Sequence, residues 1–207
     1  MNKKIREVGL HRLFCLSTFL LAALAPSQAH ASDQAQQLNV RVGWLKASYS
    51  GTNVESSFSV MPVTNIEYEI FSTLRSSFLL NAILAIDFSS SQIRYAGFGA
   101  GQRFYFSGNG LSLNRSEGDF SYEAQSDLRY FAGWNLNFAQ VMVVEFGKVL
   151  QANSGLIEAQ GHGGLSYQLG KSSSLQLLVN TGYGYGISSV SVSGIVIGAY
   201  LGIAWLL

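Results

Sequence analysis

The chain ends in the stretch GIVIGAYLGIAWLL, residues 194–207, and this stretch decides the fold class. Its odd positions are all apolar, whereas Gly194, Gly198 and Gly202 make three of the even positions small. Side chains of a strand point alternately to its two faces, so one face here is a continuous apolar stripe that includes Trp205. The pattern predicts a β-strand that turns one face to lipid, as in a membrane-spanning barrel.

A transmembrane helix is the competing interpretation, because residues 190–207 carry no charge and the three glycines have a small-xxx-small spacing. The solidly apolar part covers only about 14 residues, however, and a spanning helix needs about 20. Just upstream, Val190 and Val192 alternate with serines, which is a period of two. Glycine and β-branched residues are also poor helix formers. The strand interpretation is therefore favoured.

Residues 1–31 are predicted to be a cleaved secretory signal peptide. Four basic residues precede an apolar segment at 13–24, and Ala29-His30-Ala31 offers a small-residue cleavage site. Cys15, the only cysteine, would leave with this segment, so no disulfide is expected in residues 32–207. This remainder suits a single domain. Its nine basic and eleven acidic residues give a net charge near −2, without the basic patch that nucleic acid requires.

The alternation recurs along residues 32–207. Apolar and aromatic residues hold every second position of runs such as 38–44, 78–88, 128–136 and 175–185, opposite amides, charges and glycines. Nine runs are clear, and short turns at 72–76, 107–110, 137–140 and 170–173 predict a tenth strand within 107–121. If that polar segment is instead a loop, another run is wrong and eight strands become the better count. The predicted fold is an all-β, antiparallel up-and-down transmembrane β-barrel with about ten strands, and eight as the alternative.

Charged residues fall on the inward side of these runs, where a barrel interior accepts them and a dry sandwich core would not. The predicted lumen charge network comprises Arg41, Glu67, Glu69, Asp87, Arg103, Asp127, Arg129, Glu145, Glu158 and His162. Eight strands leave an interior just wide enough for side chains, so a filled lumen is favoured over a pore. Arg103, on a strand with Gly97, Gly99 and Gly101, is expected to reach Asp87 of the preceding strand.

Outward aromatic residues are predicted to form two girdles at the membrane interfaces. Phe78, Phe104, Phe106, Trp134, Tyr167 and Trp205 are assigned to the periplasmic rim, and Trp44, Phe88, Phe146, Tyr183 and Tyr185 to the outer rim.

With these features the chain resembles the small outer-membrane β-barrels of Gram-negative bacteria, the OmpA/OmpX-type class. Leu201, Ile203, Trp205 and Leu207 are similar to the C-terminal signal read by the barrel-insertion machinery, although this chain ends in leucine rather than phenylalanine. The resemblance implies residence in the bacterial outer membrane, assembly by that machinery, and contact with outer-membrane lipid and lipopolysaccharide. A monomer is expected.

His162 is the only histidine outside the predicted signal peptide. A lipid A deacylase-like barrel enzyme would pair a histidine with a serine two residues later, and Gly164 stands there. The aspartate pair and histidine-aspartate pair of an omptin-like protease are not apparent, and one histidine among scattered carboxylates is no metal cluster. No catalytic residue, metal site or cofactor is predicted, and His162 is expected to be a hydrogen-bonded structural residue.

These observations predict a non-enzymatic outer-membrane barrel with a structural or surface-interaction role. A narrow cation-favouring pore is the alternative, because acidic residues outnumber basic ones in the predicted lumen. A lipid A-modifying enzyme is the second alternative.

Overall fold

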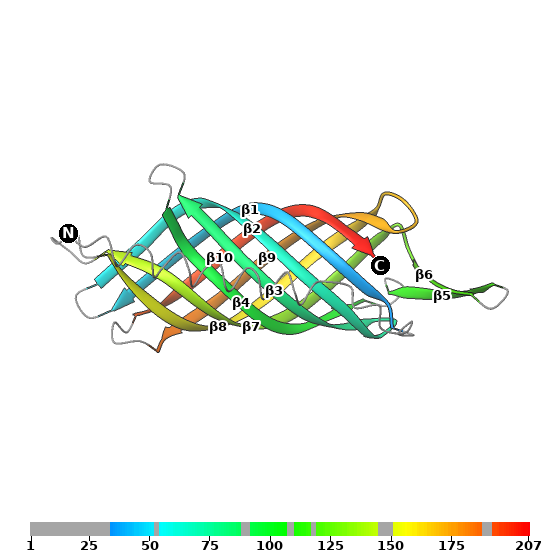
Figure 1. The fold of residues 1–207 in the computed structure, drawn as a ribbon, viewed down its shortest axis with the longest axis horizontal. Helices are drawn as coiled ribbons and strands as arrows, with labels where there is room; N and C mark the ends of the chain where they lie inside the picture. The colour runs from blue at the N-terminus through cyan, green and yellow to red at the C-terminus, as the bar shows by residue number, and fades with distance from the viewer. Residues whose placement is uncertain are drawn as a thin grey trace, which may run out of the picture. The chain divides into compact units, whose positions relative to one another are not determined.

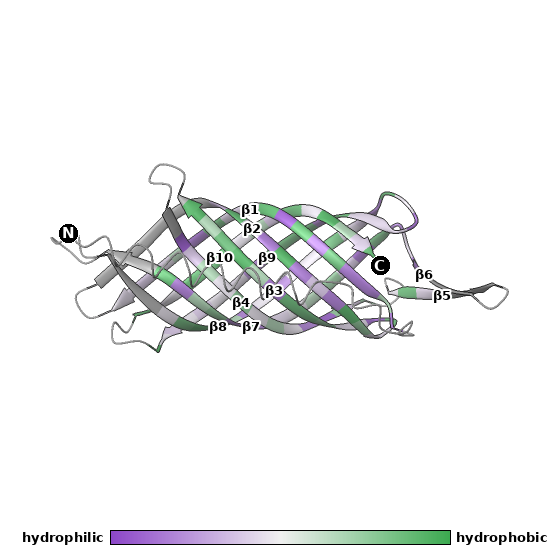
Figure 2. Ribbon diagram, in the orientation of Figure 1, coloured by the Kyte–Doolittle hydropathy of each residue, from purple (hydrophilic) through white to green (hydrophobic). Residues whose placement is uncertain are grey.

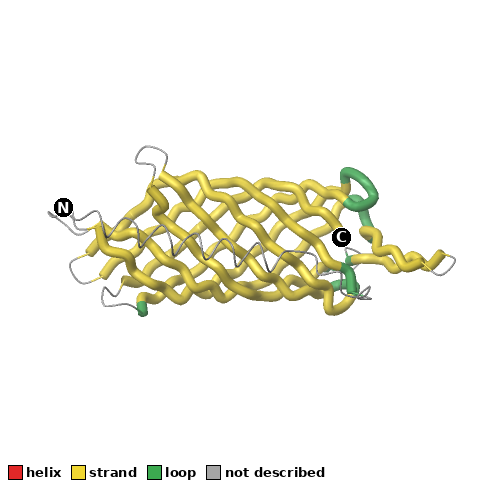
Figure 3. Tube along the Cα trace, viewed as in Figure 1, coloured by secondary structure: helices red, strands yellow, loops and turns green. Residues whose placement is uncertain are grey.

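Eight antiparallel strands close into a barrel in the order β1-β10-β9-β8-β7-β4-β3-β2 (Figures 1 and 3). The computed structural model describes residues 34–51, 54–87, 92–106, 110–116, 119–144, 151–187 and 192–207, so the predicted signal peptide lies outside the described residues. The barrel strands are β1 (Gln36–Gly51), β2 (Val54–Thr73), β3 (Ser76–Asp87), β4 (Gln92–Tyr105), β7 (Leu128–Val144), β8 (Gln151–Gln168), β9 (Ser173–Gly186) and β10 (Val192–Leu206).

The strand register is staggered around the barrel. Following hydrogen-bonded partners from Gln37 through every strand in turn leads back to β1 at Ala47, ten residues further along. A stagger of this kind goes with strands tilted by about 35–45° from the barrel axis and an interior that side chains fill. β1 begins and β10 ends at the same end of the barrel, which we call the terminal end, and the opposite end is called the loop end.

The two-residue alternation of the sequence separates the outside of the barrel from its inside (Figure 2). On β10 the odd residues from Ile195 to Trp205 face outward and are exposed, whereas Val196, Tyr200 and Ala204 are buried. The same separation holds on β1, where Trp44 is exposed and Arg41 is buried. The terminal segment is therefore a strand, as the alternation predicts.

Among the described residues, no helix is long and apolar enough to cross a membrane.

The predicted count of ten strands is wrong, and the alternative of eight is correct. Residues 137–140 form no turn, because they lie inside the uninterrupted strand β7 and continue its pairing with β4 and β8. A spanning strand needs only about 9–11 residues, so a strand of 17 residues was divided into two runs.

The predicted tenth barrel strand is a separate hairpin. In this segment the described residues form β5 (Leu111–Ser116) and β6 (Asp119–Ala124), and these two strands pair with each other and with none of the described barrel strands. The backbone N–H of Leu111 donates to the carbonyl of Leu74 (2.8 Å), so the base of the hairpin adjoins the β2–β3 turn at the terminal end. Its polar residues suit water better than lipid, which is why the segment stays out of the barrel wall.

Candidate functional site: the lumen of the barrel

An ion-pair network fills the terminal end of the lumen. Arg41 pairs with Glu67 (2.9 Å), and Arg103 pairs with both Glu67 (2.7 Å) and Glu69 (2.7 Å). All four side chains are at most 2% exposed. Charges buried this deeply are tolerated when they are paired and their remaining hydrogen-bonding groups are satisfied.

Neutral side chains complete the hydrogen bonding of the two glutamates. Asn39 Nδ2 donates to Glu67 Oε1 (2.9 Å), while the hydroxyls of Tyr105 (2.9 Å) and Ser77 (2.5 Å) donate to Glu69 Oε1. On the cationic side, Arg41 Nη1 donates to Asn65 Oδ1 (2.8 Å). Five strands are tied together in this way, because the partners come from β1, β2, β3 and β4 and, through the bond from Arg41 Nε to Gln176 Oε1 (3.1 Å), from β9.

A glycine makes room for one arginine of the network. Gly202 of β10 faces Arg41 across the strand pair, and a Cβ at this position would lie 2.7 Å from Arg41 Cγ and 2.1 Å from the Val40 carbonyl oxygen.

The loop end of the lumen is held together differently. Glu158 of β8 is fully buried and accepts hydrogen bonds from Tyr49 (2.5 Å), Tyr95 (2.6 Å) and Gln160 Nε2 (2.8 Å). We call Glu158, Tyr49 and Tyr95 the tyrosine clamp; it joins β8 to β1 and β4 across the lumen. Gly184 leaves space for it, since a Cβ there would lie 2.9 Å from Glu158 Cγ.

Apolar residues surround the tyrosine clamp. They are buried, with 0–4% exposure, and come from six of the barrel strands: Leu45, Ala47, Val63, Ile83, Ala85, Ala139, Val141, Leu156, Val192 and Val196. The loop end of the described lumen is therefore mostly apolar, with one carboxylate bound by neutral donors.

Between the two ends lies a band of neutral polar groups. Asn81, Asn135, Asn137 and Asn180 are buried, and each has at least one side-chain atom without a hydrogen-bond partner. His162 lies among them at 6% exposure, and both of its ring nitrogens are without a partner. The described side chains do not provide the hydrogen bonds expected for His162; the ring of Phe131 lies beside it, at a centroid distance of 6.5 Å.

The structure places the predicted charge network as follows. Arg41, Glu67, Glu69, Arg103, Arg129, Glu158 and His162 are buried in the lumen. Asp127 is not, because it lies in the exposed turn before β7 and only its carbonyl is used, as acceptor for the N–H of Gln168 (2.7 Å). Glu145 lies outside the described residues, and the side chain of Asp87 is also outside the description.

The expected pairing of Arg103 with Asp87 is wrong. Arg103 is opposite Ser77 in the β3–β4 pair, ten residues along the strand from Asp87. At about 3.3 Å per residue that separation is about 33 Å. Glu67 and Glu69 of β2 are the partners instead.

Tyr49 and Tyr95 were not among the predicted site residues. Tyr49 lies beyond the predicted run 38–44 and continues the odd-numbered inward positions of β1 after Arg41 and Leu45. Tyr95 likewise continues the inward positions of β4 before Gly97. Extending the inward alternation of β1 beyond Leu45, and that of β4 before Gly97, identifies both tyrosines.

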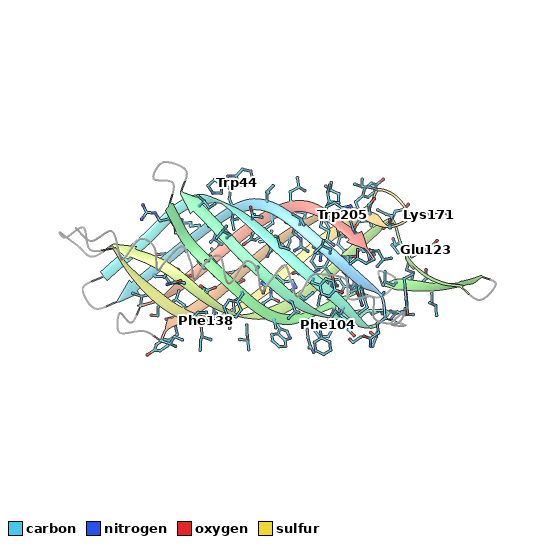
Figure 4. The ribbon with its side chains drawn as sticks, viewed as in Figure 1. Trp44, Phe104, Glu123, Phe138, Lys171 and Trp205 are labelled. Carbon is cyan, nitrogen blue, oxygen red and sulfur yellow. The ribbon has the colours of Figure 1, made fainter. Side chains whose placement is uncertain are left out.

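Nine of the predicted girdle residues face outward. Trp44, Phe78, Phe104, Phe106, Trp134, Tyr167, Tyr183, Tyr185 and Trp205 are 38–62% exposed, and Figure 4 shows Trp44, Phe104 and Trp205 on the outside of the barrel wall. Phe88 and Phe146 lie outside the described residues. That these rings sit at the membrane interfaces stays a prediction.

Catalytic and metal chemistry find little support in the described part of the chain. It contains no group of three or more histidine, cysteine, aspartate or glutamate side chains that could hold a metal ion. His162 has no serine or carboxylate within hydrogen-bonding distance, and the position two residues later is Gly164.

Comparisons with known proteins agree with the barrel. No family model matches the chain, and no curated protein is detectably similar to it in sequence. Among solved structures, the N-terminal β-barrel domain of Pseudomonas aeruginosa OprF is similar, with 12% identity over 82% of this chain and 97% of that chain and a TM-score of 0.50. Neisserial surface protein A is 15% identical over 81% of this chain and 96% of that chain, with a TM-score of 0.49. Ail of Yersinia pestis is 10% identical over 83% of this chain and 98% of that chain, with a TM-score of 0.44.

At these identities the likeness shows the fold. The chain has the fold of the small bacterial outer-membrane β-barrels, and the prediction of that class is confirmed. The outer-membrane location predicted from the sequence is consistent with this fold and stays a prediction.

Proposed function

We propose that this protein is an outer-membrane barrel with a plugged lumen and a structural or surface-interaction role, and that its terminal end faces the periplasm. The observation that carries the proposal is that two barriers follow one another along the lumen. An ion crossing it would meet the Arg41–Glu67–Arg103–Glu69 network at one end and the apolar residues around the tyrosine clamp at the other.

Both parts of this arrangement oppose ion flow. Breaking a buried ion pair to admit an ion leaves charges without partners, and moving an ion past apolar side chains removes its hydration. The barrel thus resembles a filled cylinder held by cross-links between strands. Such a barrel would act through the surfaces at its two ends and through its lipid-facing wall, and not through its lumen. This is the basis of the proposed structural or surface-interaction role.

The narrow cation-favouring pore is supported less well. The described lumen contains three buried arginines (Arg41, Arg103 and Arg129) and three buried glutamates (Glu67, Glu69 and Glu158), so its charge is balanced. The acidic excess in the sequence came partly from Asp127, which is exposed. The lipid A-modifying enzyme lacks a partner for His162.

The partners proposed for this barrel follow from the fold class. The barrel-insertion machinery would read Leu201, Ile203, Trp205 and Leu207, which all face outward on β10 or just beyond it. Lipid and lipopolysaccharide would surround a single copy.

Single-channel conductance of the refolded protein in planar bilayers tests the proposal. We expect no sustained conductance steps, because the network and the apolar end both remain closed. A steady conductance with preference for cations would contradict the plugged barrel and favour the pore.

A further inference from the structure

We propose that the terminal end of the barrel holds a binding site for a small oxyanion, a carboxylate or phosphate group, with Arg129 as its principal ligand. The site is separate from the network that fills the lumen. It rests on a buried cation without a counter-charge and on a polar pocket that this cation lines.

Arg129 differs from the other two arginines of the lumen. It is 3% exposed, yet none of the ion pairs found among the described residues includes it. Its Nη1 has no hydrogen-bond partner, its Nη2 donates only to Ser166 Oγ at 3.3 Å, and its guanidinium lies 5.3 Å from the ring centre of Tyr105. A buried charge is costly without a partner, so this geometry favours an anion beside Nη1.

A pocket beside Arg129 supplies further donors. Its polar lining consists of Arg129, Lys171, Gln37, Gln168, Ser172, Ser173 and Ser174, and no carboxylate is among the lining residues. Figure 4 shows Lys171 at the end of the barrel where the C-terminus lies. Two cationic groups with serine hydroxyls suit the oxygens of an oxyanion, to which charge-assisted bonds are strong.

The serine hydroxyls are oriented for donation. Ser166 Oγ donates to Ser174 Oγ at 2.8 Å, so the proton of Ser166 is already used. Ser174 accepts this bond and keeps its own proton for another acceptor. The volume of the pocket, about 10 Å³, holds one water-sized atom, which corresponds to a single oxygen of the anion.

The walls of the pocket are fixed in advance. The N–H of Leu206 donates to the Ser172 carbonyl (2.8 Å), and Gln168 Nε2 donates to the Lys171 carbonyl (3.1 Å), which holds the β8–β9 turn. Leu111 and Ala124, from the base of the β5–β6 hairpin, also line the pocket. These apolar groups lower the local dielectric and strengthen the attraction between Arg129 and an anion.

The test is thermal unfolding of the refolded protein, from which residues 1–31 are omitted, in detergent during titration with sodium acetate, sodium phosphate or sodium chloride. A ligand of the folded state raises the unfolding temperature and the effect saturates. We expect acetate or phosphate to raise it by about 2–4 °C in the wild type, and Arg129→Gln to abolish the saturable rise. Lys171→Gln, in an exposed turn, should weaken the apparent affinity about two- to fivefold.

Arg75→Gln is the matched control, because Arg75 is an exposed arginine of the β2–β3 turn and does not line the pocket. A response to acetate alone or to phosphate alone would support the site and identify which class of oxyanion it takes. The proposal is overturned if chloride acts as strongly as the oxyanions, if no salt gives a saturable rise, or if Arg129→Gln responds like the wild type.

Discussion

The two ends of the lumen are closed by different chemistry. At the terminal end, Arg41 and Arg103 share Glu67, Arg103 also pairs with Glu69, and the network therefore contains charges of both signs. At the loop end, the carboxylate of Glu158 is bound by the hydroxyls of Tyr49 and Tyr95 and by the Gln160 amide, with apolar residues around them.

This difference indicates at which end of the lumen a substitution should lower the stability of the barrel most. Removing one member of a charged network leaves the others buried without compensation, whereas removing a neutral donor leaves a carboxylate with its other donors. The terminal end should therefore dominate the stability of the lumen, and the loop end should contribute smaller, separable increments.

The largest effect is expected for Arg103→Met. This change removes both ion pairs to Glu67 and Glu69 and leaves Glu69 without a cationic partner among the described residues. Breaking a buried pair costs about 3–5 kcal/mol, so the free energy of unfolding in bilayers should fall by that amount and the urea midpoint should fall with it. The barrel should also become leakier to small ions.

Arg75→Met is the control, because this arginine is exposed in a turn at the same end. Adding Glu69→Gln to Arg103→Met should restore part of the stability, since it removes one of the uncompensated charges. An unchanged urea midpoint in Arg103→Met would show that the network is solvated and would favour a pore.

A smaller effect is expected at the tyrosine clamp. Tyr49→Phe and Tyr95→Phe each remove one hydroxyl donor to Glu158, and a hydrogen bond to a charged group is worth about 1.5–3 kcal/mol. Each variant should lower the free energy of unfolding by about that amount, as measured in urea. Tyr183→Phe, on the exposed outer wall, is the control with no expected change.

A double-mutant cycle between Tyr95→Phe and Glu158→Gln tests the clamp directly. The two changes should be non-additive, because both remove the same bond. Additive effects would mean that the Tyr95 hydroxyl does not depend on Glu158, and the clamp would have to be abandoned.

The sequence predicted the wall of the barrel better than its contents. The alternation of residues such as Leu201 and Ile203 with glycines identifies which face meets lipid, because side-chain direction along a strand has a fixed period. The predicted number of strands was wrong for two reasons. The alternation continues through β7 across residues 137–140, where a turn was predicted. The regular spacing of the predicted turns also favoured a strand at 111–118, although that segment is polar.

The partners within the lumen depend on register, which one sequence does not contain. Arg103 and Asp87 are on neighbouring strands and both have the inward parity, yet the β3–β4 register pairs Arg103 with Ser77 and Asp87 with Gln92, which places them far apart. Glu67 and Glu69 come from β2, two strands away from Arg103, and meet it across the lumen. Contacts across the interior require the stagger of the closed barrel, which only the structure supplies.

The smallest effect, and the sharpest contrast with Arg103, is expected for His162→Leu. Both ring nitrogens of His162 are buried without partners, so an apolar side chain loses no hydrogen bond and removes unsatisfied polar atoms. We expect the free energy of unfolding in urea to be unchanged or to rise by about 1 kcal/mol. Gln160→Leu is the matched control on the same strand and face, because Gln160 donates to Glu158 and accepts from Asn180 Nδ2 (2.9 Å), and this variant should be destabilised. If His162→Leu loses as much stability as Gln160→Leu, the histidine is hydrogen-bonded in the native barrel, and the neutral band between the two ends contributes to closing the lumen.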